Sequence, residues 1–515
     1  MFLTPTYREL NGGSGVLRNG KLLLSVATVC AVTLLAGPAF AAAPTPGATT
    51  IGDPYYPTTG NGGYDAINYD VRLQYEPKTD NLRGTTTVLA KATQDLSEFS
   101  FDFLLKTSSV RVSGIPAAFT LKDGKLTVKP VKPLANGQQF SVIVQYEDVP
   151  SAVKVNGYSG WKKTDDGALA VQEPDVAPWW FPGNNHPRDK ATFDISVEVP
   201  DGKSALSNGA LLGKSSRLGK TRWNWRSTKP AAPYLISLEI GDFDVVQGTG
   251  YKNQPLLNAY SRSLGDSLPS AQASIERTPE VLEHFSGIYG EYPFEAQGGV
   301  VSPGLSFALE NQTRPVYSKK FFDKGLNQYV VAHELGHQWW GDSVSVDTWR
   351  NIWLNEGFAS YTEWLWSEHV GEGTAAELAK WYYDSYKADN PLWQEVIGDP
   401  GAGNEFGAVY TRGPLAVAAL RQEIGDDNFF VLLKEWQRQH RYATGTIEQF
   451  QKLAEALSGK DLKSFFDTWL FTKGKPAYEF KSGQPGVRSI APAAKPKSVD
   501  LIQHTHDLLL EGESH

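Results

Sequence analysis

Two periodicities of apolar residues divide the chain. Before residue 247, apolar and polar residues alternate in short stretches between turn residues, as in half-buried β-strands; examples are 69–75, 140–146, 193–199 and 234–245. Beyond it, apolar positions recur at helical spacing, at 274–285, 354–369, 374–389, 413–424 and 428–439, and Thr446 with Gln449 forms a capping box for a further helix. We therefore predict a multidomain α+β protein, with an all-β domain at 64–247 and a mainly helical domain at 248–480.

The first 41 residues have the features of an export signal. Arg18 and Lys21 precede an apolar stretch at 22–35, and residues 39–41 form an A-x-A cleavage site. A membrane anchor is the alternative, but the apolar stretch is shorter than the ~20 residues that a spanning helix requires. The sequence therefore predicts a secreted protein without a stable membrane anchor.

Composition predicts little order in two further segments. Residues 42–63 are rich in Pro, Gly and Thr, which predicts a flexible lead-in. Residues 481–515 are rich in Pro, Ala, Gly and Lys, which predicts a disordered tail. We expect the tail histidines to be solvated; they are His504, His506 and His515.

Net charge limits the classes of binding partner, and cysteine content limits how the chain can be stabilised. The net charge is −8, and the predicted signal carries three basic residues against one acidic, so its removal leaves −10. That balance argues against nucleic acid or an anionic membrane as partner. The only cysteine, Cys30, lies in the signal. The stability of the mature chain therefore depends on core burial rather than on disulfides. The sequence does not indicate the oligomeric state.

The strongest chemical signal is His333-Glu334-Leu335-Gly336-His337, followed eighteen residues later by Asn355-Glu356. Histidines four apart share one helix face, and a glutamate from a second helix supplies a third ligand. Three protein ligands leave one open position, as in catalytic zinc sites, so we expect one Zn²⁺ per chain. Glu334 is placed to be the general base toward a zinc-activated water.

The alternative is a surface helix with two solvated histidines. Residues 329–332 are mostly apolar and Trp339-Trp340 follow the motif, so this helix is predicted to be buried. Buried imidazoles and carboxylates are costly without a partner such as a metal. The sequence therefore favours a metallopeptidase.

At this point the chain resembles a known family. The runs VVAHELGHQWWGDSV and WLNEGFASYTEW are similar to the aminopeptidase N family of zinc metallopeptidases, the gluzincins. The resemblance implies a thermolysin-like catalytic domain at 248–480, with His333, His337 and Glu356 as zinc ligands and Glu334 as base. Glu363, two helical turns beyond Glu356, either orients a ligand or is a solvated carboxylate.

Further motifs contribute carboxylates that could bind the free N-terminus of a peptide substrate. Such partners are needed because a buried ammonium requires opposite charges. Residues 307–311 resemble the family's G-A-M-E-N motif in Ala308, Glu310 and Asn311, which assigns Glu310 to the substrate amine. Residues 172–182 resemble a first-domain segment in which the residue at the position of Glu173 faces the first substrate side chain, so Glu173 is expected to give the substrate amine a second anionic contact.

Two other residues receive roles from the same comparison. The run VYTRGP resembles the segment in which a tyrosine stabilises the charged carbonyl oxygen, here Tyr410. Pro414 in that run is expected in the first turn of a helix. His186 is expected to make structural hydrogen bonds rather than to bind metal.

Too few residues follow position 480 for the large helical C-terminal domain of many family members, so we expect a short secreted form with an open cleft. Three alternatives remain: a zinc endopeptidase, an epoxide hydrolase of the same family, and an inactive peptide-binding relative. A secreted β-sandwich binding protein would explain the first domain alone. The preferred N-terminal residue is not indicated.

Overall fold

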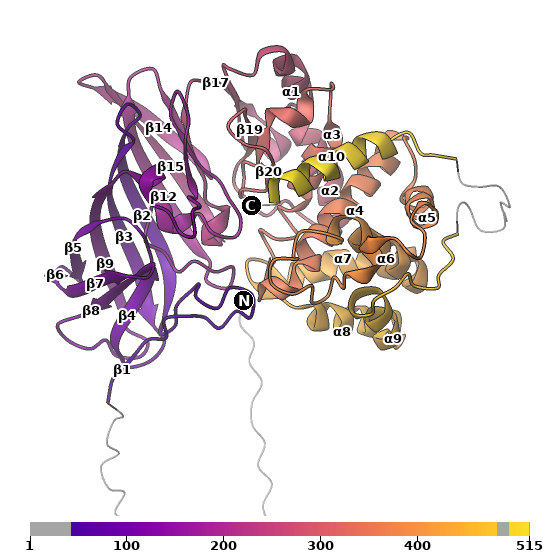
Figure 1. Cartoon of the computed structure of the whole chain (residues 1–515), viewed down its shortest axis with the longest axis horizontal. Helices are drawn as coiled ribbons and strands as arrows, with labels where there is room; N and C mark the ends of the chain where they lie inside the picture. The colour runs from indigo at the N-terminus through magenta and orange to yellow at the C-terminus, as the bar shows by residue number, and fades with distance from the viewer. Residues whose placement is uncertain (1–42, 482–493, 514–515) are drawn as a thin grey trace, which may run out of the picture. The chain divides into compact units, whose positions relative to one another are not determined.

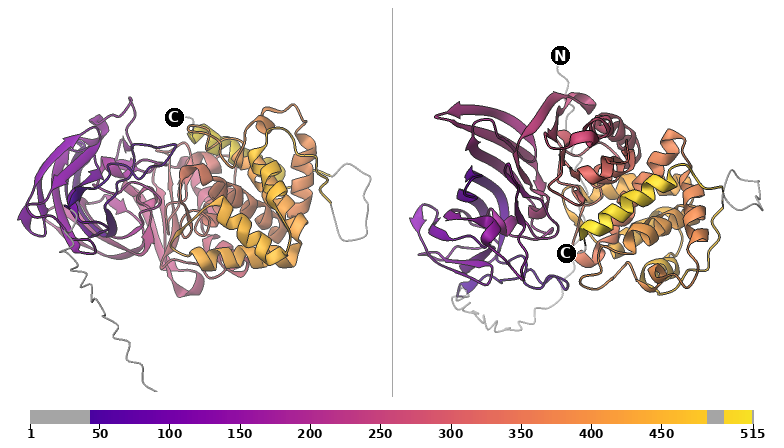
Figure 2. Two further views of the ribbon diagram at one scale, coloured as in Figure 1. Left: turned by 90° about the horizontal axis from the view of Figure 1, so that it is seen from below. Right: turned by 45° about the horizontal axis from the view of Figure 1, so that its top comes forward.

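The computed structural model describes residues 43–481 and 494–513, which belong to one compact unit. The predicted signal at 1–41 lies outside the described residues. Figures 1 and 2 show a β-rich N-terminal half and a mainly helical second half, as the two apolar periodicities predicted.

The first half is built on an eight-stranded sheet. In β2 (Tyr64–Glu76), Tyr69, Val71 and Leu73 are buried while Asp70 and Arg72 point to the other face, so one face packs on the core. The sheet order is β14 (Ala210–Arg217), β15 (Lys220–Ala231), β12 (Ala191–Pro200), β2, β3 (Asn81–Ala92), β9 (Gln139–Asp148), β5 (Thr107–Val112) and β6 (Ile115–Pro116).

Two four-stranded sheets accompany it. The first has the order β1 (Thr45–Pro46), β4 (Leu96–Asp102), β8 (Lys125–Lys129) and β7 (Ala118–Lys122). The second has the order β10 (Trp161–Lys163), β11 (Ala168–Ala170), β16 (Leu238–Gly241) and β13 (Ser204–Leu206).

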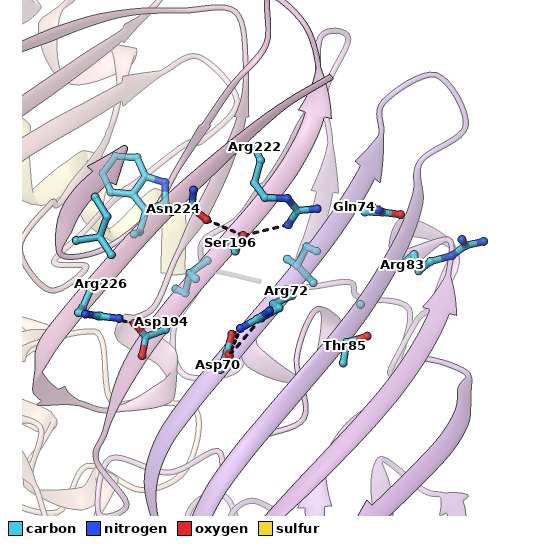
Figure 3. Close-up of a pocket in the computed structure, with 15 residues that line it drawn as sticks. Asp70, Arg72, Gln74, Arg83, Thr85, Asp194, Ser196, Arg222, Asn224 and Arg226 are labelled. Atoms are coloured by element: carbon cyan, nitrogen blue, oxygen red, sulfur yellow. Dashed lines mark hydrogen bonds and ion pairs between the residues drawn. The ribbon is translucent and has the colours of Figure 1, made fainter. Parts of the chain in front are cut away.

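The exposed face of the eight-stranded sheet forms a wide polar hollow of about 1010 Å³ (Figure 3). Its arginines are already paired with carboxylates: Arg72 Nη2 lies 2.8 Å from Asp70 Oδ2, and Arg226 Nε lies 2.5 Å from Asp194 Oδ1. Pairs this exposed contribute little to stability. None of the predicted site residues lines this hollow.

The lead-in at 42–63 is ordered where the structure describes it, contrary to the prediction. β1 pairs in parallel with β4, and the buried Asp53 carboxylate bonds His186 Nε2 at 3.0 Å. His186 thus makes a structural hydrogen bond, as expected. Composition missed this order because the partners of the segment lie far away in sequence.

The second half begins with a five-stranded sheet ordered β17 (Phe243–Thr249), β18 (Pro255–Ser261), β19 (Gln297–Ser302), β21 (Val316–Ser318) and β20 (Ala308–Leu309). The domain boundary predicted at 247 therefore falls inside a strand. The strand predicted at 234–245 is also divided, since β16 and β17 belong to different sheets.

Helices follow and enclose an aromatic core rich in buried tryptophan. The helix predicted at 274–285 is two helices, because Pro279 fits the first turn of a helix but not its interior. The helices are α1 (Leu268–Ile275), α2 (Thr278–Tyr289), α3 (Gln328–Gly336), α4 (Trp353–Val370), α5 (Ala375–Ser385), α6 (Val409–Ile424), α7 (Asp426–His440), α8 (Ile447–Ser458) and α9 (Lys463–Phe466). The predicted capping box of Thr446 and Gln449 starts α8. A two-stranded ladder joins β22 (Ser345–Val346) to β23 (Thr444–Gly445).

The prediction of a disordered tail is wrong for α10 (Val499–Glu513). This helix packs against α3 (Figure 1). Its residues Val499, Ile502 and Leu509 are buried. Their three- and seven-residue spacing forms one apolar face. The polar composition of the wider segment concealed this face. Within the described residues, no helix combines the length and apolarity needed to cross a bilayer.

Candidate metal centre

The first two histidines of the site lie on a helix that is buried along its whole length. The side chain of Asn327 caps α3 by accepting hydrogen bonds from the backbone N–H groups of Tyr329 and Val330. His333 lies in the last turns of α3 and His337 at its C-terminal end. A buried, capped helix fixes the direction of both imidazoles.

Glycines allow the neighbouring helices to approach closely. A Cβ atom at Gly336 of α3 would lie 2.7 Å from Thr362 Oγ1 of α4. A Cβ atom at Gly413 of α6 would lie 2.8 Å from the Cα of Gly357 in α4. Only residues without a Cβ atom permit these contacts. They bring Glu356 of α4 and Tyr410 of α6 to the histidines of α3.

Three ligand atoms form a compact triangle. His333 Nε2 and His337 Nε2 are 3.2 Å apart, and Glu356 Oε2 lies 3.3 Å and 3.4 Å from them. A tetrahedral zinc ion with ligand bonds near 2.05 Å separates its ligands by about 3.3 Å. The triangle therefore has the dimensions of three corners of a zinc tetrahedron.

The other ring nitrogens explain why this triangle requires a cation. His337 Nδ1 is 2.9 Å from the carbonyl oxygen of Trp340, and His333 Nδ1 is 2.6 Å from Glu363 Oε1. Both Nδ1 atoms therefore donate, which leaves a lone pair on each Nε2 in the neutral rings. Two lone pairs and a carboxylate face one another, and burial makes that arrangement costly without a cation. The residues thus fit a bound Zn²⁺.

Glu334, the residue predicted to be the base, lies beside the triangle. Its side chain is buried, and Oε1 has no hydrogen-bond partner among the described residues. Burial raises the pKa of Glu334 to about 8, against the opposing effect of the two histidines. A nearby dication would favour the ionised form.

These groups line one small cavity, and the expectation of an open cleft is not met. Its volume is about 10 Å³, which is room for about one water molecule. Leu509 of α10 is one of its walls, so the C-terminal helix covers the space that the sequence left open. The lining residues are Glu173, Ala308, Leu309, Glu310, His333, Glu334, His337, Glu356, Tyr410 and Leu509.

The two carboxylates predicted to bind the substrate amine, Glu310 and Glu173, both line this cavity. One oxygen of Glu310 lies within 4.8 Å of ligand atoms of both Glu334 and His337. The hydroxyl of Tyr234 donates to Glu310 Oε1 at 3.2 Å and holds it in place. Glu173 faces the same cavity from the N-terminal half. Asn311 is not among the described lining residues; its amide nitrogen donates to the carbonyl oxygen of Leu235 at 3.2 Å.

Tyr410 and Glu363 also join the site. The ring centroids of Tyr410 and His333 are 6.0 Å apart. Glu363 is fully buried, so its alternative interpretation as a solvated carboxylate is wrong. Although burial alone would raise its pKa, hydrogen bonds from two histidines lower the pKa of Glu363. One of those histidines is His333, and the other is His506.

Sequence reasoning missed three residues of the site: Tyr234, His506 and Leu509. The apolar spacing of Val499, Ile502 and Leu509 could have revealed α10 and thereby the last two. Tyr234 precedes β16 by several residues and carries no motif of its own.

Together, the buried ligand triangle and the adjacent carboxylate define a mononuclear metal site of the metallohydrolase type. Comparison with known proteins agrees with this class. Residues 65–235 match the peptidase M1 N-terminal domain, and residues 275–469 match the peptidase family M1 domain. The chain belongs to the M1 family of peptidases.

Relatives with recorded functions or structures support the assignment. Aminopeptidase N of Streptomyces lividans is 26% identical over 440 residues, which cover 80% of this chain and 50% of that protein. Aminopeptidase M1 of Arabidopsis thaliana is 26% identical over 350 residues, 63% of this chain and 39% of that protein. The chain therefore spans about half the length of these relatives or less.

Solved structures match over a larger share. The M1 zinc metallopeptidase of Deinococcus radiodurans superposes with a TM-score of 0.75 at 26% identity, covering 85% of this chain and all of that one. A variant from the same organism, bound to a Tyr-Ser-Ala substrate, has a TM-score of 0.73 at 25% identity and covers 84% of this chain and 99% of that one.

Proposed function

We propose that the protein is a zinc-dependent aminopeptidase that removes the N-terminal residue of peptides. The observation that carries this proposal is a single cavity whose walls include both the His333–His337–Glu356 triangle and the carboxylate of Glu310. A cation site beside a buried carboxylate suits a substrate whose scissile carbonyl lies one residue from a free ammonium. Relatives named as aminopeptidases and the tripeptide-bound structure support it.

In this proposal Glu310 and Glu173 bind the substrate ammonium. Burial raises the pKa of the Glu310 carboxyl, and His337 opposes that rise. An ammonium group beside it would favour the ionised form further, because opposite charges within about 4–6 Å stabilise each other. Binding at these carboxylates fixes the first peptide carbonyl above the ligand triangle.

The residues around that carbonyl carry the reaction. A bound Zn²⁺ would supply Lewis acidity toward the carbonyl and toward water. Glu334 accepts the proton of the attacking water and passes it to the leaving amine. Tyr410 donates a hydrogen bond to the carbonyl oxygen as its negative charge develops.

Acetylation of the substrate amine tests the exopeptidase assignment. We expect purified protein to hydrolyse an alanyl or leucyl fluorogenic amide and to lose all measurable cleavage of the N-acetylated compound. The acetyl group removes the positive charge that Glu310 and Glu173 would bind, so no opposite charge compensates the desolvation of these carboxylates on binding. Initial rates on the matched pair provide the measurement.

Each alternative function gives a different result in this assay. Equal rates on free and acetylated peptides would indicate an endopeptidase and leave Glu310 without its role. Turnover of an epoxide but of no peptide would indicate the epoxide-hydrolase branch. Binding of peptides without turnover by zinc-loaded protein would indicate an inactive relative.

We also propose that the protein is exported, from the signal features of residues 1–41. Expression of the full chain in a secreting host should release a protein whose N-terminus, determined by sequencing, begins at Ala42. A cell-associated protein that retains its first 41 residues would contradict export.

A further inference from the structure

Two side chains of the C-terminal helix α10 form hydrogen bonds with the start of α3 and with Glu363. Thr505 Oγ1 accepts a hydrogen bond at 3.0 Å from Asn327, the residue that caps α3. His506 Nε2 lies 2.9 Å from Glu363 Oε1. Both side chains are buried. The helix that carries two metal ligands is therefore contacted by α10 at its start and, through Glu363, at His333.

The contact at His506 extends a chain of hydrogen bonds from the ligand triangle. Glu363 Oε1 accepts from His333 Nδ1 at 2.6 Å and from His506 Nε2 at 2.9 Å. A carboxylate oxygen held by two donors from different helices loses the rotation that a single donor would allow. The orientation of His333 thus depends on a residue of α10 that lies 143 positions beyond Glu363 in the sequence.

The imidazole of His506 also packs against the catalytic tyrosine candidate. Its ring centroid lies 6.0 Å from that of Tyr410 and 6.4 Å from that of His333. These three rings, from α10, α6 and α3, are mutual neighbours, since Tyr410 and His333 are also 6.0 Å apart. Loss of the His506 ring would leave space beside both of the other residues.

A second metal ion is the alternative reading of this cluster, because ligand atoms of His333, Glu363 and His506 lie within 4.8 Å of one another. The two distances to Glu363 Oε1 are hydrogen-bond lengths, and a shared oxygen already occupied by two N–H donors is poorly placed for an ion. His333 Nδ1 would also have to lose the proton that keeps its Nε2 free for the first metal. The hydrogen-bonded chain is therefore favoured.

We propose that His506 is a positioning residue of the metal centre, which acts through Glu363 on His333 and by ring contact on Tyr410. This inference rests on the proposed zinc aminopeptidase function. Partners that orient metal ligands typically change metal affinity or activity by about 10–100-fold when removed. His506 thereby makes α10 a part of the active site rather than a cover alone.

The test compares His506→Ala with His506→Gln in the full chain. The glutamine amide places a donor near the position of Nε2, whereas alanine removes both the donor and the ring. Zinc affinity is measured by competition with a chromophoric chelator below the unfolding temperature of every variant, and kcat and KM are measured on an alanyl amide. We expect His506→Ala to bind zinc about 10-fold or more weakly and to lower kcat with little change in KM, and His506→Gln to recover most of the zinc affinity.

Two controls on the same helix separate positioning from loosening of α10. His504→Ala removes a half-buried imidazole whose Nδ1 lies 3.2 Å from Lys324 Nζ, and should match the wild type. Leu509→Ala removes a cavity wall, and should change KM while leaving zinc affinity intact.

Three results would overturn the inference while the wild type remains an active zinc enzyme: unchanged zinc affinity in His506→Ala, an equal loss in Leu509→Ala, or no recovery in His506→Gln. A wild-type protein that binds no zinc and cleaves no free-amine substrate would instead contradict the proposed function.

Discussion

Substitution of Glu334 by glutamine is expected to retain the metal and to lower kcat by about a thousandfold or more. The amide has the shape of the carboxylate but cannot accept the proton of the attacking water, and general acid–base catalysis typically contributes about 10²–10⁴-fold. The ligand triangle of His333, His337 and Glu356 does not include Glu334, so its geometry should persist. Metal content by elemental analysis and kcat on an alanyl amide provide the measurements.

A matched control is available on α2. Glu283 is exposed, and Glu283→Gln makes the same chemical change away from the site, so it should leave kcat and metal content unaltered. Near-normal turnover in metal-loaded Glu334→Gln would exclude Glu334 as the base. Loss of the metal together with activity would make it a supporting residue instead.

Removal of the metal should abolish activity and lower the unfolding temperature. Without the metal, the two imidazole Nε2 atoms and the Glu356 carboxylate remain 3.2–3.4 Å apart in a buried site and lose the ion that holds them together. A ligand that binds the native state alone adds RT ln(1 + [L]/Kd) to stability, about 4 kcal/mol at a thousandfold excess over Kd. Activity and thermal unfolding of dialysed, chelator-treated protein, before and after addition of Zn²⁺, provide the measurement.

Magnesium provides the specificity control for this experiment. Mg²⁺ prefers octahedral oxygen ligands, so the two-histidine triangle should not accept it and neither activity nor stability should return. Full activity in protein shown by elemental analysis to be metal-free would refute the metal mechanism.

The ligand set could be predicted from the sequence because its geometry is local. A four-residue spacing places His333 and His337 on one helix face whatever surrounds them, and few roles other than metal binding suit such residues in an apolar segment. The strands were predicted for a similar reason, since alternation along β2 or β12 follows directly from one buried face.

Features that depend on distant partners could not be predicted. The lead-in became ordered through contacts of Asp53 and β1 with residues far along the chain. Similarly, α10 is stabilised by one apolar face and by buried polar bonds to Asn327 and Glu363, which composition does not reveal. It also contributes Leu509 to the wall of the small cavity.

Local patterns misplaced some boundaries. Pro414 was expected in a first helical turn, but α6 begins five residues earlier, at Val409. Proline there cannot donate to the carbonyl oxygen of Tyr410 four residues before it. The helix α6 packs closely against α4, and such a tertiary contact has no signature in the sequence of one helix.

The glycine contact between α4 and α6 fixes how closely these two helices, and the site residues that they carry, approach each other. Since Gly357 and Gly413 touch where a single methyl group would not fit, the separation of Glu356 from Tyr410 is set by bare backbone. Chemistry at this centre is therefore vulnerable at positions that bear no reactive atom, and a search for inactivating substitutions limited to ionisable side chains would overlook them.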